Sequence, residues 1–137
     1  MPSFVNCLYY AALFDGEGSL GIYLKGKGRH HYLSVSLANQ HKPTIERLVS
    51  IWPGFLYEKK DEHIWQWTVT AAKAEKFLRD IFPYSRIKKD QIALALEFRD
   101  RMVKGSTGGR FKLSLTGGEL AIREDLRIKL QDLKRMY

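Results

Sequence analysis

The chain has 137 residues, which suits one domain with its own hydrophobic core. Hydrophobic residues make up 45% and charged residues 28%, as in ordinary globular proteins. The chain contains no run of eighteen apolar residues that could form a transmembrane helix, and its single cysteine, Cys7, excludes an internal disulfide. The N-terminus has no signal-peptide pattern, so we expect an intracellular, non-secreted protein with no membrane partner, in a compartment that the sequence does not identify.

Charge is distributed unevenly along the chain, whose formal net charge is +8. Residues 23–42 hold four basic residues and no acid, and residues 84–112 hold eight basic residues against three acids. Residues 1–22 contain two charged side chains, Asp15 and Glu17. This pattern favours a polyanionic partner that faces an acidic centre. The alternative is that the basic side chains are merely solvated.

The first half of the chain predicts a helix, a hairpin and a second helix. Ser3 can cap a helix over residues 4–14, which the glycines that follow should end. Strict alternation of apolar and polar residues then predicts two strands, joined by a turn at 26–30. Pro43 fits the first turn of a helix that reaches about Ile51. The strands are expected at residues 19–25 and 32–38.

The second half predicts another hairpin followed by helices. Strands are expected at 55–58 and 64–70, and a helix at about 71–82 is stopped by Pro83. A longer helix is expected at about 86–103. A Gly-rich connection at 105–109 then leads to a last helix that starts near residues 116–119 and reaches the C-terminus.

This order predicts an α+β fold with one four-stranded antiparallel sheet. Both hairpins have one apolar and one polar face, so helices should cover the apolar face and leave the other open. The open face would present groups of the kind that contact base edges and phosphates, although polar strand faces also simply meet water. Its candidate residues are Tyr23, Lys25, Ser34, Ser36, Tyr57, Lys59, Gln66 and Thr68.

The segment Tyr10–Ser19, YAALFDGEGS, resembles the signature of LAGLIDADG homing endonucleases. Tyr10 stands at the usual leading Leu, and Glu17 replaces the second Asp of the signature while keeping a carboxylate. The element order over about residues 4–103 also resembles the αββαββα domain of the family's single-motif, homodimeric branch. The resemblance implies a single domain over 1–137 with a saddle-shaped sheet. A helical extension over about 104–137 does not align with the family.

The resemblance implies a homodimeric, site-specific endonuclease that cuts both strands of a long pseudo-palindromic DNA site. In the family the last acid of the motif binds the metal together with a backbone carbonyl, which here implies Glu17 and the carbonyl of Gly16. Mg²⁺ is the expected cofactor, with Mn²⁺ as a substitute and Ca²⁺ bound without cleavage. This agrees with the chemistry, since Mg²⁺ takes one or two carboxylates plus substrate phosphates. One carboxylate per chain is too few, and a two-fold dimer would bring two copies of Glu17 together.

The same resemblance implies roles for other positions. Asp15 matches an acid that ties down backbone at the helix end. Lys88, with Arg86 next, matches a basic residue near the scissile phosphates. Gln40 matches a polar residue that holds solvent near the metal, and its neighbour Asn39 is an alternative at that position. The dimer interface would use Leu8, Ala11, Ala12 and Asp15, and Lys27, Arg29 and Arg86 would join the open face in binding DNA.

Two other functions are compatible with the sequence. A non-cleaving DNA or RNA binder on the same fold, such as an intron maturase or a regulator, would share every binding feature. An enzyme that uses Asp15 and Glu17 as a paired acid and base, as glycosidases do, is a third class. Two residues so close on a turn need not converge, and such an enzyme would leave the basic surface unexplained. We therefore expect no small-molecule substrate.

Overall fold

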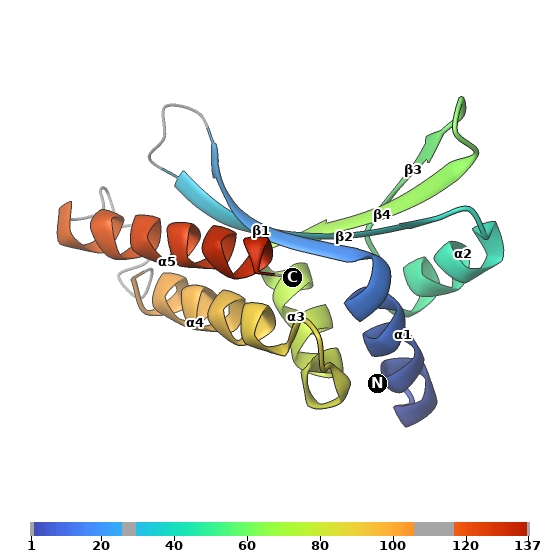
Figure 1. The fold of residues 1–137 in the computed structure, drawn as a ribbon, viewed down its shortest axis with the longest axis horizontal. Coiled ribbons are helices and arrows are strands. Elements are labelled where there is room, and N and C mark those ends of the chain that lie inside the picture. The colour runs from blue at the N-terminus through green and yellow to red at the C-terminus, as the bar shows by residue number, and fades with distance from the viewer. Residues whose placement is uncertain (1, 26–29, 106–116, 137) are drawn as a thin grey trace.

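The computed structural model describes residues 2–25, 30–105 and 117–136 and has the predicted α+β fold (Figure 1). Within that part of the chain, no helix is both long and apolar enough to span a membrane. The elements in order are α1 (Phe4–Glu17), β1 (Gly18–Lys25), β2 (His30–Asn39), α2 (Lys42–Ile51), β3 (Phe55–Lys59), β4 (Ile64–Thr70), α3 (Ala71–Ile81), the 3₁₀ turn η1 (Phe82–Tyr84), α4 (Lys89–Gly105) and α5 (Gly117–Arg135).

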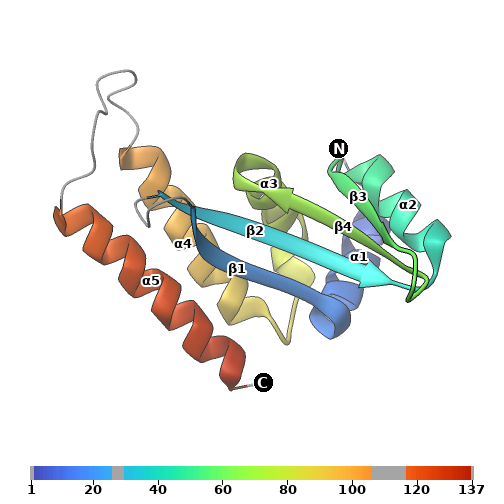
Figure 2. The same cartoon turned by 90° about the horizontal axis from the view of Figure 1, so that it is seen from above.

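The four strands form one antiparallel sheet in the order β1-β2-β4-β3. Figure 1 shows that the sheet is curved like a saddle and that the helices lie on its convex side. Seen from above, α3 and α4 lie under the sheet and α5 runs along its β1 edge (Figure 2). Within residues 2–25, 30–105 and 117–136, no helix lies on the concave side, as the two amphipathic hairpins predicted.

The strand register separates the two faces cleanly. Leu20 pairs with Val35, Ile22 with Leu33, and Leu37 lies opposite Trp67 on the face that the helices cover. All six of these residues are buried, with at most 3% of their surface exposed. Residues one position away point to the open side, because successive side chains of a strand alternate between faces. The predicted assignment of strand faces is therefore confirmed.

An aromatic cluster around Phe77 joins the sheet to three helices. The ring of Phe77 on α3 meets Phe14 of α1, Trp52 at the end of α2 and Trp67 of β4 at centroid distances of 5.5, 5.0 and 4.7 Å. The Trp67 indole also donates to the Trp52 carbonyl at 2.8 Å, so its polar atom is satisfied inside the core. This cluster fixes where α1 ends relative to the sheet.

The C-terminal extension contains a long helix that docks by apolar and polar contacts. Leu126 and Leu130 of α5 are buried, and the helix packs against α4 and β1. His31, on the covered face of β2, shares a hydrogen bond of 3.0 Å with Glu124. Hydrogen bonds from Arg127 and His31 lower the pKa of Glu124 to about 2. Helix α5 thus packs on the hydrophobic core through its buried leucines.

Three helix boundaries differ from the prediction, each for a local reason. The first helix continues to Glu17 because Gly18 serves as its C-cap, donating its amide to the Phe14 carbonyl. The third helix ends at Ile81, and Pro83 lies in the 3₁₀ turn. The fourth helix begins at Lys89 instead of Arg86, and the amides of residues 86–88 before it donate to the Asp15 carboxylate, which holds this segment at the end of α1. Of the predicted turn at 26–30, His30 instead begins β2, and of the predicted connection at 105–109, Gly105 instead ends α4; the remaining residues of both segments lie outside the described residues.

We predict that Gly18→Ala destabilises the domain by about 1 to 3 kcal/mol, as overpacking does. A β-carbon at this position would lie 2.0 Å from the buried Phe14 ring. Urea denaturation measures the effect. Gly16→Ala is the control: no atom lies within 4 Å of its added carbon, so its free energy of unfolding should stay equal or rise by up to about 1 kcal/mol. Equal stability of the two variants would contradict the packing argument.

Candidate functional site

The last turn of α1 sends its two acids in different directions. Asp15 is 8% exposed and points into the domain, whereas Gly16 and Glu17 are exposed where the chain enters β1. Residues one and two positions apart do not share a face of a helix. The signature therefore supplies one buried acid and one acid that solvent reaches.

Asp15 holds the segment between η1 and α4. Its carboxylate accepts hydrogen bonds from the Ser85 hydroxyl at 2.5 Å and from the amides of Arg86, Ile87 and Lys88 at 2.7, 3.1 and 3.1 Å. Burial acts to raise the pKa of Asp15, but these hydrogen bonds outweigh it and lower the pKa below its usual value. The carboxylate is thus ionised and fully engaged, which leaves it no role as a free acid beside Glu17.

The same contact brings basic side chains to the end of α1. The Lys88 ammonium donates to the backbone carbonyl of Asp15 at 2.9 Å, and Arg86 is exposed nearby in the chain. From the end of α5 comes Lys134, whose pKa is lowered by burial and by the neighbouring charge of Lys88. Nothing in the sequence singles out Lys134, because it lies 46 positions from Lys88, in a segment that does not align with the family.

Glu17 is oriented by a residue that the sequence offered only as an alternative. The Asn39 side-chain amide donates to Glu17 Oε2 at 2.5 Å, while Asn39 Oδ1 accepts the His41 amide at 2.7 Å. Glu17 and Asn39 line an open pocket of about 290 Å³ together with Ala38, Gln40 and Ile64. Gln40 is therefore close to the site, but Asn39 makes the direct contact.

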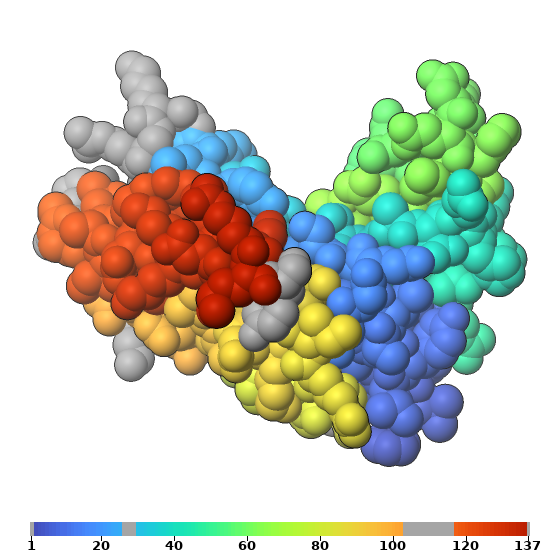
Figure 3. All heavy atoms as spheres, viewed as in Figure 1, coloured from blue at the N-terminus to red at the C-terminus, as the bar shows by residue number. Residues whose placement is uncertain are grey.

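The concave face holds the eight predicted contact residues that belong to the strands, whereas Arg86 lies between η1 and α4. On the β1–β2 side, Tyr23 and Lys25 are exposed and Ser34 and Ser36 are half-buried. On the β3–β4 side, Tyr57 and Lys59 are exposed, Gln66 and Thr68 are half-buried, and the register puts all four on this same face. Figure 3 shows the hollow between the two raised ends of the sheet. Lys27 and Arg29 lie outside the described residues.

Helix α1 has an apolar face that the rest of the chain leaves in solvent. Val5, Leu8 and Tyr9 are 70%, 46% and 53% exposed, and Ala12 continues the same stripe toward Gly16. Ala11 and Asp15 lie on the opposite, buried side. Of the four residues expected at a dimer interface, Leu8 and Ala12 thus present surface to a partner, whereas Ala11 and Asp15 pack inside their own chain. Val5 and Tyr9 share the helical spacing of Leu8 and Ala12 and extend that surface.

The residues at the end of α1 suit a hard divalent cation in part. Glu17 has an exposed carboxylate, and one of its two oxygens accepts a hydrogen bond from Asn39. Oxygen atoms of carboxylates and carbonyls are the ligands that Mg²⁺ prefers. No group of three or more His, Cys, Asp or Glu residues gathers to hold a metal among the described residues. Glu17 and the carbonyl of Gly16 could thus supply part of a coordination shell for such an ion.

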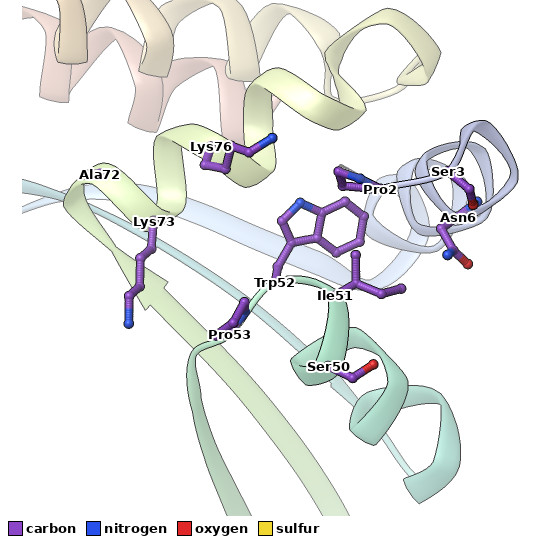
Figure 4. Close-up of a pocket in the computed structure, with 10 residues that line it drawn as sticks. All are labelled: Pro2, Ser3, Asn6, Ser50, Ile51, Trp52, Pro53, Ala72, Lys73 and Lys76. Carbon is purple, nitrogen blue, oxygen red and sulfur yellow. The ribbon is translucent and has the colours of Figure 1, made fainter.

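A larger pocket of about 730 Å³ lies on the helical side, away from Glu17 (Figure 4). It is formed where the N-terminus of α1, the end of α2 and the start of α3 meet. The Trp52 indole at its base donates to Asp80, and the Lys76 ammonium binds the same carboxylate. None of the predicted site residues lines it, so its size alone does not make it the functional site.

Comparison with known proteins identifies the fold through structure. No family model and no curated protein sequence matches the chain. Among solved structures, the homing endonuclease I-CvuI in complex with DNA superposes with a TM-score of 0.77 over 94% of this chain and 82% of its own, at 14% identity. An archaeal intron-encoded homing endonuclease complexed with DNA gives a TM-score of 0.77 over 94% and 84%, at 18% identity. The LAGLIDADG meganuclease I-AabMI, bound to uncleaved DNA, gives 0.69 over 88% of this chain and 44% of its own, at 17% identity. The chain thus has the LAGLIDADG homing endonuclease fold.

We predict that Asp15→Asn lowers the free energy of unfolding by about 2 to 4 kcal/mol, because an amide group cannot accept four hydrogen bonds. The wild type should lose stability as the pH falls from about 5 toward 2, since the lowered pKa of Asp15 stabilises the fold above that range. The variant should lose less over the same range. Chemical denaturation at several pH values measures both effects. Asp125→Asn, which removes an exposed ion pair with Lys129, is the control and should cost less than about 0.5 kcal/mol.

Proposed function

We propose that this protein is a site-specific, metal-dependent DNA endonuclease that acts as a homodimer on a long, nearly palindromic duplex site. The observation that carries the proposal is the exposed carboxylate of Glu17 at the end of α1, where the Lys88 ammonium binds the Asp15 carbonyl, in a domain whose sheet has a concave open face. An exposed carboxylate and a cation at that point suit phosphodiester hydrolysis. The shared fold with DNA-bound homing endonucleases supports the same conclusion.

The dimer would form through the apolar face of α1. This apolar surface is unfavourable to leave in contact with water, and it consists of Val5, Leu8, Tyr9 and Ala12. The small residues Ala12 and Gly16 would allow a second helix to approach closely. Because α1 ends at Glu17, packing two copies of α1 about a two-fold axis would bring the two carboxylates to one centre. A two-fold protein also requires a target with matching symmetry.

The chain's own residues have separable tasks at that centre. Glu17 and the carbonyl of Gly16 would hold a Mg²⁺ ion, with Mn²⁺ able to replace it and Ca²⁺ bound without turnover. When bound, such an ion lowers the pKa of a water molecule and neutralises charge on a phosphate. Asn39 fixes the rotamer of Glu17, and Gln40 can position solvent in the same pocket. Lys88, backed by Lys134, would stabilise negative charge on the phosphate.

DNA would lie along the concave face, with the strands in the major groove. Tyr23, Lys25, Ser34, Ser36, Tyr57, Lys59, Gln66 and Thr68 would contact bases and backbone there, Arg86 would bind backbone near the cut, and Lys27 and Arg29 would reach the flanks. The net charge of +8 supports binding that weakens steeply as salt rises. Intron homing is the biological role that such cleavage would serve.

The decisive experiment is cleavage selection from a randomised, partly palindromic duplex library. We expect symmetric sites to be cut with Mg²⁺ and to be bound without being cut in Ca²⁺. Glu17→Gln should keep the acceptor for Asn39 and retain DNA binding, but lose cleavage by more than about a hundredfold because the metal ligand is gone. Glu46→Gln, an exposed change on α2, is the control and should cut normally. Sites bound without cleavage in Mg²⁺ or Mn²⁺ would support a maturase or regulator instead.

We predict that Leu8→Glu converts the dimer to a monomer, because it places a charge in an apolar helix contact. Sedimentation velocity and DNA cleavage measure the change, and both dimer and activity should be lost. Ile128→Glu is the matched control, since this side chain on α5 is 43% exposed but lies off the α1 face. A Leu8→Glu protein that remains dimeric would contradict the assignment of the interface.

A further inference from the structure

The open face is chemically different at its two ends. The register puts three serines (Ser19, Ser34 and Ser36), Lys25 and the ring pair of Tyr23 and Tyr32 on the β1–β2 part, which therefore presents hydroxyl groups and a charge around two tyrosine rings and, among its paired residues, no purely hydrocarbon side chain. The β3–β4 part instead presents Phe55, Tyr57 and Ile64 on the same face, here called the β3–β4 apolar patch. An exposed apolar cluster on an otherwise polar face indicates a site that binds an apolar group, because burying the cluster against such a group removes it from water.

The members of the patch are neighbours across the two strands. Tyr57 lies opposite Gln66 and diagonal to Ile64, while Phe55 lies opposite Thr68 and next to Tyr57 on the same face. Phe55 is 67% and Tyr57 51% exposed, so both rings keep most of their surface for a partner. Lys59, opposite Ile64, adds a positive charge at one end of the patch.

The patch begins beside the candidate cleavage site. Ile64 lines the pocket that also contains Glu17 and Asn39. The hairpin end that carries Lys25 and His30 lies at the other end of the saddle (Figure 1). On the proposed function, the β3–β4 apolar patch would therefore face the base pairs nearest the cut, and the hydroxyl-rich part would face base pairs farther out.

We infer that the β3–β4 apolar patch recognises the C5 methyl groups of thymines in the base pairs next to the cleavage site; this inference rests on the proposed function. In the major groove the thymine methyl is the apolar group that distinguishes one base pair from another. Gln66, opposite Tyr57, is the residue type that binds the N6 and N7 edge of adenine. The patch and Gln66 together can thus recognise both members of an A·T pair.

The test compares thymine with uracil, which lacks the methyl and keeps the hydrogen-bonding edge. A duplex recovered from the library selection is rebuilt with deoxyuridine in place of thymidine, either in the base pairs flanking the cut or in the outer base pairs. In Ca²⁺, we expect each inner replacement that meets the patch to weaken wild-type binding about three- to fivefold, the value of one buried methyl group. Outer replacements should have a smaller effect.

Two exposed substitutions assign the effect to these side chains. Phe55→Ser and Tyr57→Ser should bind the thymine and the inner-uracil duplexes equally, while Tyr23→Ser, the matched control on the β1–β2 part, should still discriminate. Thermal unfolding checks that each variant is folded. Wild-type binding that ignores the inner methyls, or selected sites without inner thymines, would overturn the inference. Failure to select any bound DNA would instead overturn the proposed function, so the two failures are distinguishable.

Discussion

The structure depends on one buried carboxylate. Asp15 accepts hydrogen bonds from the Ser85 hydroxyl and from three successive amides, and thereby joins the end of α1 to a segment about 70 residues later. An ionised group buried in this way is stable because its partners satisfy it, and losing any of them would leave charge without solvation. Through this contact Lys88 reaches the end of α1, where Glu17 also lies.

Helix α1 combines three tasks that different sides of a helix can perform at once. One side packs into the aromatic cluster through Tyr10 and Phe14, and the opposite side leaves Val5 and Leu8 in solvent, where the proposed second copy would pack. Its C-terminal end delivers Glu17. Since the helix is fixed to the sheet by its buried side, its exposed side and its end keep a constant position relative to the concave face. The proposed dimerisation and the proposed catalysis are thus geometrically linked.

Much of the fold and part of the site were predictable from local patterns. Alternation along the strands gave the sheet faces, because the two-residue period is a local property, and the segment Tyr10–Ser19 pointed to the acids. Helix ends were predicted less well, since the start of α4 at Lys89 depends on bonds to the distant Asp15. Asn39 was offered only as an alternative to its neighbour Gln40, and Lys134 was not selected, because nothing in their own neighbourhood distinguishes them from other polar residues.

The sequence by itself therefore determined the α+β class, the amphipathic hairpins, the basic charge and the two acids at the end of the first helix. These follow from side-chain period, charge and local backbone preference, which act over a few residues. Tertiary structure alone decided that Asp15 is buried while Glu17 is exposed, that Ala11 faces inward, and that α5 brings Lys134 to Lys88. Those choices depend on which surfaces pack together, and packing joins residues that are far apart along the chain.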